Sequence, residues 1–452
     1  MNKITLPEDV RTILLQLKNS GHKAYAVGGC VRDSLLGLTP HDYDICTSAT
    51  PQETEECFRN RRVIETGIKH GTVTVLLHDE PFEITTFRID GNYTDGRHPE
   101  TVSFTSDVED DLARRDFTIN AMATDGISVI DPFGGQKDLA NCIVRCVGNP
   151  DDRFGEDALR LLRALRFAST YDFNIDPDTA DSIHRNKTLL DRISRERVQS
   201  ELVKMLNGKH VFSILHDYSD VITQIIPELT PAVGFNQNNR YHCYTVYDHI
   251  AHSVENYHGT DPVIKMTMLL HDIGKPSCYT ETELYGQRSG HFYGHAPVSR
   301  EMAEPILERL RFDNKSKTEI LTLIGHHDTS FSNPSAKFVR RQISNLSKGL
   351  FEKLLEVRYA DITAHSQAAQ ASSLEKLAKV KELYEQIKTE DACFKIKDLA
   401  INGNDLLRIG YKEGPQIGKA LQRMLDAVLD DMLENNKETL KAAAEEILAS
   451  KE

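Results

Sequence analysis

Two aspartates near the N-terminus have a spacing suited to binding divalent cations. Asp42 and Asp44 lie in the segment D-Y-D-I. In a strand, side chains two residues apart share one face, about 6.5 Å apart along the chain. Carboxylates placed in this way bind Mg²⁺, and two such ions activate an attacking hydroxyl and stabilise a leaving pyrophosphate. A second D-x-D, at 176–178, is typical of a turn or cap, so spacing alone does not establish a site.

A glycine turn precedes these aspartates. The segment A-V-G-G-C-V-R-D-S-L-L-G ends an apolar stretch with Gly28 and Gly29 and begins a helix with Arg32 in its first turn. Glycine lets the backbone approach a phosphate, and a helix N-terminus presents free N–H groups to an anion. Arginine adds a forked donor. The segment predicts a phosphate-binding turn, although many Gly-Gly pairs before a helix are only turns.

A basic helix follows in the segment R-F-G-E-D-A-L-R-L-L-R-A-L-R-F. Its arginines recur every third residue, so successive side chains rotate by about −60° along an i±3n ridge. Asp157 and Arg160 are expected to be surface neighbours, whereas Arg166 points about half a turn away from Asp157. These residues together with Arg163 therefore cannot all contact one base. The alternative is an ordinary solvated basic face.

Histidines and aspartates recur in helical contexts further along the chain. The candidate metal ligands are His249, His271, Asp272 and Asp361. Imidazole and carboxylate ligands together suit Mg²⁺, Mn²⁺, Ni²⁺ or Fe. His295 and His326 are candidates for a second metal site or for binding phosphate. The alternative is a domain that serves as an RNA-binding or oligomerisation scaffold.

The elements that must position these residues fall into an α+β part and an all-α part. Strands are expected in V-T-V-L-L-H, P-F-E-I-T-T-F-R-I, E-T-V-S-F-T, I-S-V-I-D-P-F and C-I-V-R-C-V, with a helix at 9–19. From Arg153 onward the apolar residues recur at helical spacing, and the chain is expected to be almost wholly helical. The predicted domains are residues 1–150, 151–215, 216–390 and 391–452.

The composition excludes several classes of protein. Charged residues make up 27% of the 452 residues and the net charge is −14, which argues against a non-specific nucleic-acid coat protein. Local basic stripes at 153–166 and 185–209 still allow RNA binding. No secretory signal or apolar run of about 20 residues is found, so we expect a cytoplasmic protein with no membrane partner. The eight cysteines form no C-x-x-C pair, which makes a zinc ribbon or disulfide framework improbable.

These motifs together resemble those of the polymerase-β-like nucleotidyltransferases. G-G-x-V-R-D-x-L-L-G followed by D-x-D-I is similar to the bacterial-type (class II) CCA-adding tRNA nucleotidyltransferase and poly(A) polymerase family. Residues 88–104 resemble its flexible loop, residues 114–122 its R-R-D-x-x-x-N-A-M block, and residues 131–135 its D-P-F-G-G hinge. The resemblance covers residues 27 to about 205. It implies a nucleotidyltransferase head with a mixed sheet, followed by a helical neck, an HD domain and a tail.

The resemblance also assigns roles to the candidate residues. Asp42 and Asp44 hold the catalytic metals, with Glu83 as a third carboxylate. Four residues contact the nucleotide's phosphates or the nucleotide itself, namely Gly28, Gly29, Arg32 and Arg115. Asp157 and Arg160 present acceptor and donor groups to the base, and Arg163 and Arg166 are further nucleotide-binding residues. Glu196, Arg197 and Glu201 match a block that braces the neck.

The remaining ligand candidates resemble the H…HD…D pattern of HD-domain phosphohydrolases. In that pattern His249, His271, Asp272 and Asp361 are the metal ligands. The tail, residues 391–452, resembles the part of bacterial tRNA nucleotidyltransferases that contacts the tRNA elbow.

The expected function is addition of CCA to tRNA 3′ ends from CTP and ATP, with Mg²⁺ at the nucleotidyltransferase site and a divalent metal at the HD site. One alternative is a poly(A) polymerase or an enzyme that adds only CC or only A. The apparently complete loop at 95–99 favours full CCA addition. Alternatives of another class are a metal-dependent phosphohydrolase acting on nucleotides or RNA ends, and a tRNA-binding scaffold.

Overall fold

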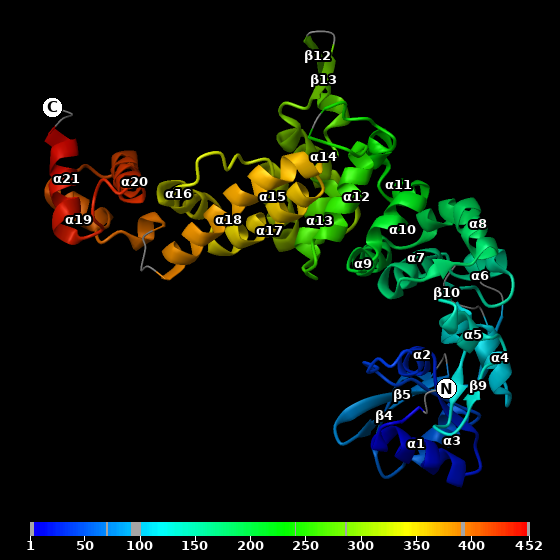
Figure 1. Cartoon of the computed structure of the whole chain (residues 1–452). Coiled ribbons are helices and arrows are strands. Elements are labelled where there is room, and N and C mark those ends of the chain that lie inside the picture. The colour runs from blue at the N-terminus through cyan, green and yellow to red at the C-terminus, as the bar shows by residue number, and fades with distance from the viewer. Residues whose placement is uncertain are drawn as a thin grey trace. The chain divides into compact units, whose positions relative to one another are not determined.

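The chain divides into two compact units in the computed structural model, which describes residues 4–68, 71–91, 101–239, 241–284, 287–389 and 394–449. The first unit contains residues 1–230 with 309–311, and the second contains residues 231–308 with 312–452. Figure 1 shows the elements of each unit, coloured along the chain. The four-part division expected from the sequence stays a prediction, as does the loop at 95–99, which lies outside the described residues.

A seven-stranded mixed sheet forms the centre of the head, in the order β3-β4-β5-β2-β1-β8-β9. Its strands are β1 (Ala24–Val27), β2 (Ile45–Thr47), β3 (Arg62–Gly67), β4 (Thr72–Leu77), β5 (Glu80–Thr86), β8 (Ala123–Thr124) and β9 (Val129–Ile130). The β2–β5 pair is parallel and the other pairs are antiparallel. The mixed sheet predicted for the head is therefore confirmed.

The head also contains shorter elements around this sheet. Its helices are α1 (Glu8–Asn19), α2 (Gly29–Leu35), α3 (Pro51–Cys57), α4 (Val108–Ala113), η2 (Thr118–Asn120) and α5 (Gly135–Ala140). Two further strand pairs are β6 (Arg88–Asp90) with β7 (Val102–Phe104), and β10 (Ile143–Val144) with β11 (Asn174–Ile175). Alternate residues of β4 are buried, as expected for a strand with one face on the core.

The rest of the first unit is helical. It consists of α6 (Pro150–Glu156), α7 (Leu159–Tyr171), α8 (Pro177–Asn186), η3 (Lys187–Arg192), α9 (Arg195–Leu206), α10 (Val211–Asp217), α11 (Ser219–Ile225) and η4 (Pro227–Ala232). Helix α7 packs along α9. The buried residues of α7 include Leu161, Leu165 and Ala168, spaced at three and four residues as in an amphipathic helix.

The second unit is mainly a bundle of helices. They are α12 (Val246–Asn256), α13 (Pro262–Leu270), η5 (Pro276–Cys278), α14 (His295–Arg309), α15 (Asn314–His326), α16 (Ala336–Leu346), α17 (Lys348–Thr363), α18 (Gln367–Thr389), η6 (Ile396–Asp398), α19 (Gly403–Ile409), α20 (Pro415–Leu429) and α21 (Lys437–Ala449). Helix α13 is buried from Val263 to Leu270, so it forms the centre of this bundle. None of the helices in the described ranges is long and apolar enough to cross a membrane.

Two expectations about elements need correction. The second unit contains a hairpin, β12 (Thr280–Leu284) with β13 (Gln287–His291), where only helix was expected. The D-Y-D segment was expected inside a strand, but β2 begins at Ile45.

Candidate active site and buried histidine cluster

The three carboxylates expected at the catalytic site lie at one edge of the head sheet. Asp42 and Asp44 immediately precede β2, and the amide of Val27 donates to the carbonyl of Asp44 at 3.0 Å, which fixes the entry of the segment into the sheet. In the parallel pairing of β2 with β5, Ile45 stands opposite Ile84. Asp44 and Glu83 are the residues just before these two, and both are exposed whereas the isoleucines are buried. The sheet therefore directs these carboxylates away from the core on neighbouring strands.

The charges around Asp44 affect the pKa of its carboxyl. Desolvation raises the pKa of the Asp44 carboxyl, the Arg115 guanidinium opposes this, and the negative charges of Asp42 and Glu83 raise it further. A divalent cation bound among the carboxylates would relieve their repulsion. The donor set therefore fits a hard, oxygen-seeking cation.

The glycine turn, Gly28 and Gly29, lies next to the Arg115 guanidinium. Gly28 has φ +81°, and a Cβ added there would lie 2.7 Å from Arg115 Nη1. Its amide donates to the Met122 carbonyl at 3.0 Å, which ties the turn to the segment that carries Arg115. Gly29 begins α2 with its Cα facing the Arg32 side chain, whose Nη2 would be 3.6 Å from an added Cβ. The turn is thus bordered by two guanidinium groups.

The Arg32 side chain is held in place by contacts that could not be predicted from the sequence. It is only 7% exposed, and its Nη1 donates to Asn120 Oδ1 at 2.6 Å while its Nε donates to Asp33 Oδ1 at 2.9 Å. The guanidinium also lies over the rings of Phe167 and Tyr171, at 5.0 and 4.9 Å from their centroids. These contacts hold Arg32 in one orientation beside the glycine turn.

Asp157 lies just before α7 rather than within it. Its Oδ1 accepts from the Leu159 amide at 3.0 Å, so it caps the helix. Its Oδ2 accepts from Arg197 Nη2 at 2.8 Å. This contact gives Arg197 of the E-R-x-x-x-E block a structural role, because it orients the Asp157 carboxylate.

Arg160 is held by groups on both sides of its guanidinium. Nη1 pairs with Glu156 Oε2 at 2.7 Å, and Nη2 donates to the carbonyl of Arg114 at 3.0 Å. The contact with Arg114 joins the neck helix to the R-R-D segment of the head. A base that contacts Arg160 therefore meets a guanidinium already oriented by the protein.

The two later arginines of α7 bind different acids. Arg163 Nε donates to Asp116 Oδ2 at 2.8 Å, whereas Arg166 Nε lies 2.7 Å from Glu201 Oε2. This agrees with the expectation that the four residues do not converge on one base. Burial alone would raise the pKa of Asp116, but the positive charge of Arg163 and the hydrogen bond from Asn120 bring it below its ordinary value.

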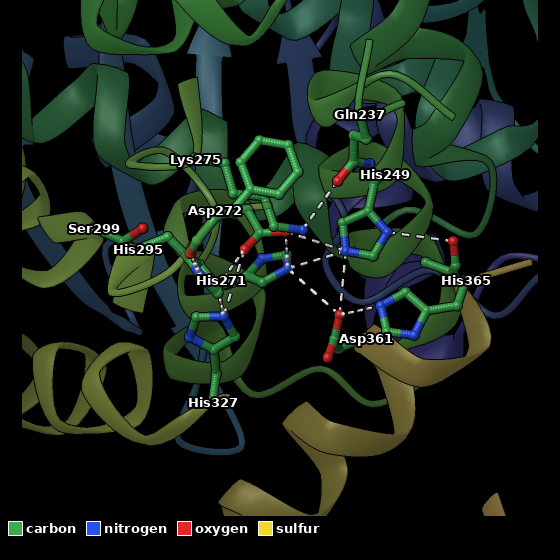
Figure 2. A network of polar contacts seen from close by, with 12 residues as sticks. Gln237, His249, His271, Asp272, Lys275, His295, Ser299, His327, Asp361 and His365 are labelled. Carbon is green, nitrogen blue, oxygen red and sulfur yellow. Dashed lines mark hydrogen bonds and ion pairs between the residues drawn. The ribbon is translucent and has the colours of Figure 1, made fainter. Parts of the chain in front are cut away.

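The four ligand candidates of the second unit lie together in its interior (Figure 2). His249 and His271 are fully buried, and Asp272 and Asp361 are 1% and 5% exposed. His249 Nε2 lies 3.2 Å from Asp272 Oδ2 and 3.1 Å from Asp361 Oδ1. His271 Nε2 lies 3.3 Å from the same Asp272 oxygen. Ligand atoms that close together match a metal-binding cluster.

The structure adds side chains to this cluster that the sequence analysis missed. His327, rather than the predicted His326, approaches His295, because α15 ends at residue 326 and turns the next side chain inward. Lys275 Nζ lies 2.6 Å from Asp272 Oδ2. His365 follows Asp361 by one helical turn, and its Nε2 lies 3.5 Å from Asp361 Oδ1. That i, i+4 spacing was visible in the sequence.

The pKa values of two of these histidines shift in opposite directions, although burial lowers both. Burial lowers the pKa of His365 to about 4, although Asp361 opposes this. It also opposes protonation of His249, but hydrogen bonds with Asp272 and Asp361 raise the pKa of that imidazole.

Comparisons with known proteins cover the whole chain. Residues 24–145 match the family described as Poly A polymerase head domain, residues 172–232 match a probable RNA and SrmB-binding site of polymerase A, and residues 294–444 match a putative tRNA nucleotidyltransferase domain 2. The CCA-adding enzyme of Limosilactobacillus fermentum is 32% identical over 449 residues, covering 98% of both chains. That of Leuconostoc mesenteroides is 32% identical over 455 residues, with the same coverage.

A solved structure agrees with these relatives. The Bacillus stearothermophilus CCA-adding enzyme, crystallised with CTP, has a TM-score of 0.72 and 28% identity over 99% of both chains. Its agreement extends through both units of the present chain. The carboxylates, glycine turn and neck residues described above therefore occur in a protein that belongs to the CCA-adding enzyme family.

Proposed function

We propose that this protein adds C, C and A to the 3′ ends of tRNA from CTP and ATP, without a nucleic-acid template. The observation that carries the proposal is the placement of Asp44 and Glu83 before paired residues of β2 and β5, near Asp42 and Arg115, in a chain that belongs to this family. The reaction joins a tRNA 3′-oxygen to the α-phosphorus of the triphosphate and releases pyrophosphate. The reaction uses a divalent metal, and we assign Mg²⁺ to this position.

The protein's own groups orient the reactants. Asp42 and Asp44, with Glu83, provide the oxygen ligands of the cations, which supply Lewis-acid stabilisation of the attacking and leaving oxygens when bound. Gly28 and Gly29 allow the triphosphate to approach the backbone. Arg115 neutralises charge on the phosphates, and Arg32 stays fixed at the turn by Asn120 and Asp33.

The residues that select the base lie in the neck, residues 151–215. Asp157 accepts an amino hydrogen from cytosine N4 or adenine N6, and Arg160 donates to an acceptor on the same edge. Uracil and guanine lack an amino group at the corresponding position, so the pair favours C and A. A good bidentate contact contributes about 1–3 kcal/mol of discrimination. Arg163 and Arg166 support this surface through Asp116 and Glu201, and the tail at 391–452 contacts tRNA away from the reacting end.

The test uses tRNA transcripts that end at the discriminator base, at C and at CC. CTP and ATP are supplied separately and together with Mg²⁺, and products are resolved at single-nucleotide length. Completion of CCA from all three substrates supports the proposal. Addition of only C or only A identifies a partial enzyme, long A tails identify a poly(A) polymerase, and no extension refutes nucleotide addition.

A second activity, metal-dependent hydrolysis of phosphate esters, is supported by the buried cluster of the second unit. Its His and Asp ligand atoms converge, and the chain order H…HD…D fits an HD-type site with His249, His271, Asp272 and Asp361 as ligands. Mn²⁺, Ni²⁺, Mg²⁺ and Fe all suit this mixed set. Release of phosphate from nucleotides or from RNA ends, lost in His271→Ala, supports this activity. Release that persists unchanged in the variant would assign it to a contaminant.

A further inference from the structure

We propose that one face of strands β3, β4 and β5 holds the single-stranded 3′ end of the RNA that receives the nucleotide, and that Arg62 binds its phosphate backbone. The inference rests on the nucleotide addition proposed above and gives the RNA strand a position on the head. We call this surface the open face. Its side chains are Arg62, Ile64, Thr74, Leu76, Pro81 and Glu83.

Strand pairing makes the open face continuous with the carboxylates of the head. Glu83 on β5 is paired with Thr74 on β4, and Thr74 is paired with Ile64 on β3. Figure 1 shows β4 beside β5 in the head. Side chains of directly paired residues point to the same face, and neighbouring strands are about 4.8 Å apart. This row of side chains therefore leads from Glu83 to the edge strand over about 10 Å.

Arg62 belongs to the next row on the same face. Pro81 on β5 is paired with Leu76 on β4, and Leu76 is paired with Arg62 on β3. Arg62 and Ile64 are two residues apart on one strand, so their side chains point the same way. The guanidinium therefore lies at the outer end of the surface that begins at Glu83.

Burial distinguishes the open face from the face that packs on the core. Val73 and Val75 of β4 are buried, whereas Thr74 between them is half-buried. The residues paired with Thr74 on the two flanking strands, Glu83 and Ile64, are exposed. The apolar core therefore lies behind these strands, and solvent reaches the side that carries Glu83.

The geometry of the reaction selects RNA as the occupant. In the sheet, β2 and β5 have β1 on one side and β4 and β3 on the other. The triphosphate is assigned to the glycine turn after β1, so pyrophosphate leaves on that side. The attacking and leaving oxygens of such a displacement lie roughly in line, on opposite sides of the phosphorus. The attacking 3′-oxygen therefore comes from the β5 side, and the strand that carries it lies over β4 and β3.

The chemistry of the open face fits a phosphate backbone. Arg62 is exposed and forms no ion pair with any residue that the structure describes. Such a guanidinium, in a protein with a net charge of −14, attracts a polyanion locally. Thr74 adds a hydroxyl, which is another group that binds phosphate oxygens. Backbone contacts carry no sequence information, which suits a strand whose 3′ end changes with each nucleotide added.

The preceding residue provides a matched comparison. Arg61 is also exposed and has no ion pair within the described ranges. It directly precedes β3, and its amide donates to the Phe58 carbonyl at 2.7 Å. Successive residues of an extended segment point to opposite faces, so Arg61 is directed away from the open face. The two arginines therefore share charge and exposure and differ in the face that they occupy.

The test measures addition of A to a tRNA transcript that ends in CC, with ATP and Mg²⁺, at several salt concentrations. Arg62→Ala should raise KM for the transcript about fivefold and leave kcat and KM for ATP within about twofold. The plot of log KM against log salt concentration should become less steep by about 0.7, the slope of one single-strand phosphate contact. Arg62→Lys keeps the charge and should recover most of the loss, and Arg61→Ala should behave as the unchanged protein.

A neutral methylphosphonate linkage locates the contact on the RNA. Placed in turn at each linkage near the 3′ end, it should raise KM for the unchanged protein at the position that Arg62 contacts. At that position the linkage should have no further effect on Arg62→Ala, because the interacting pair has already been broken. Additive effects at every linkage would overturn the assignment of Arg62 to the backbone.

The outcomes separate this inference from the proposed function. Normal addition with an unchanged KM for tRNA in Arg62→Ala, or equal effects of the two arginine variants, overturns the RNA position while nucleotide addition stands. A higher KM for ATP alone would assign Arg62 to the triphosphate and would also overturn it. If the unchanged protein adds no nucleotide, the proposed function fails. Filter retention of the CC-ending transcript by the same variants then still tests the open face, with weaker binding expected only for Arg62→Ala.

Discussion

Single side chains determine the chemistry proposed for each unit, and several could be named from the sequence. Asp42 and Asp44 were selected because they follow a glycine turn, and the charges of Asp42 and Glu83 raise the pKa of the Asp44 carboxyl. Their role as metal ligands stays a prediction. His326 was chosen over His327 because sequence does not fix the residue at which a helix ends, and one residue rotates a side chain by about 100°. Arg32 was expected to bind phosphate, but its contacts with Asn120 and Asp33 could not be predicted, because they depend on tertiary packing.

The Asp42→Ala variant tests the metal ligands of the head. Nucleotide addition should fall by at least about a thousandfold, since a group that stabilises charge in the transition state contributes on this scale. Binding of tRNA, measured by filter retention, should stay within about twofold. The control is Asp178→Ala, which changes the exposed acid of the other D-x-D. Normal addition by Asp42→Ala would refute the metal assignment.

The Asp157→Ala variant tests base selection. The ratio of kcat/KM for CTP over UTP should fall about 10- to 100-fold, because one bidentate contact contributes about 1–3 kcal/mol. The triphosphate contacts lie elsewhere, so KM for CTP should change less. Competition assays with both nucleotides measure the ratio, with the exposed Asp152 changed to alanine as the control. Retained selectivity in Asp157→Ala would remove Asp157 from base recognition.

Helices and strands position these side chains. Whether a segment is a helix or a strand was easier to predict than the residues at which it begins and ends. The 3.6-residue periodicity correctly predicted α7, α9, α12 and α15, whose buried faces are continuous. The hairpin β12–β13 was missed because its polar residues lack an apolar face that would indicate a strand. The D-Y-D segment was wrongly placed in a strand. The strand that follows it, β2, has only three residues, which is too few for a sequence pattern to locate its first residue.

The turn between β1 and α2 should tolerate no side chain at Gly28. The Gly28→Ala variant combines strain at positive φ with a Cβ 2.7 Å from Arg115 Nη1, so Arg115 must move. We expect KM for CTP to rise about tenfold and stability to fall by about 1 kcal/mol. Gly37→Ala is the control, because Gly37 has φ +74° but open space around the added Cβ. Equal KM values in the two variants would show that Arg115 does not contact the nucleotide.

The ion pair between Asp116 and α7 should make the stability of the first unit depend on pH. Burial opposes ionisation of Asp116, but Arg163 and Asn120 hold its pKa below the ordinary value of about 3.9. The stabilisation is therefore present above about pH 4 and is lost as pH falls through the lower folded-state pKa.

Asp116→Asn should accordingly lower the free energy of unfolding by about 3 kcal/mol at pH 7, and the difference should shrink below pH 4. Urea titrations across this range provide the measurement. Asp116→Asn/Arg163→Met, which removes both charges, should recover part of the loss. A loss that is the same at pH 3 and pH 7 would show that the ion pair is not its cause.

At the scale of the whole molecule, the two compact units carry separate sites. The cation ligands of the head lie in residues 1–230 and the histidine cluster in residues 231–452. The long-range pairing that builds each site was inaccessible to sequence periodicity, which reports only local structure. The resemblance of motifs supplied the expected order of the parts, and relatives of the same family align along 98% of the chain.

This division predicts two calorimetric unfolding transitions, one for each unit. The transition of the second unit should respond to metal removal. A ligand at 100 times its dissociation constant stabilises the folded state by about 2.7 kcal/mol, so a chelator should lower that Tm by about 5–10 °C. The transition of the first unit should move much less. The shift should vanish in His249→Ala. A chelator that moves neither transition would contradict metal binding by the folded cluster.

Three consecutive residues of the head connect both ends of a bound nucleotide. The Arg114 carbonyl accepts from Arg160, Arg115 lies over Gly28, and Asp116 binds Arg163. The roles proposed for these residues predict that base binding and triphosphate binding are thermodynamically linked, with a coupling free energy that is the same in both directions. A matching base is then expected to strengthen triphosphate binding, and a mismatched base to weaken it. On this proposal, fidelity is a cooperative property shared between two subsites.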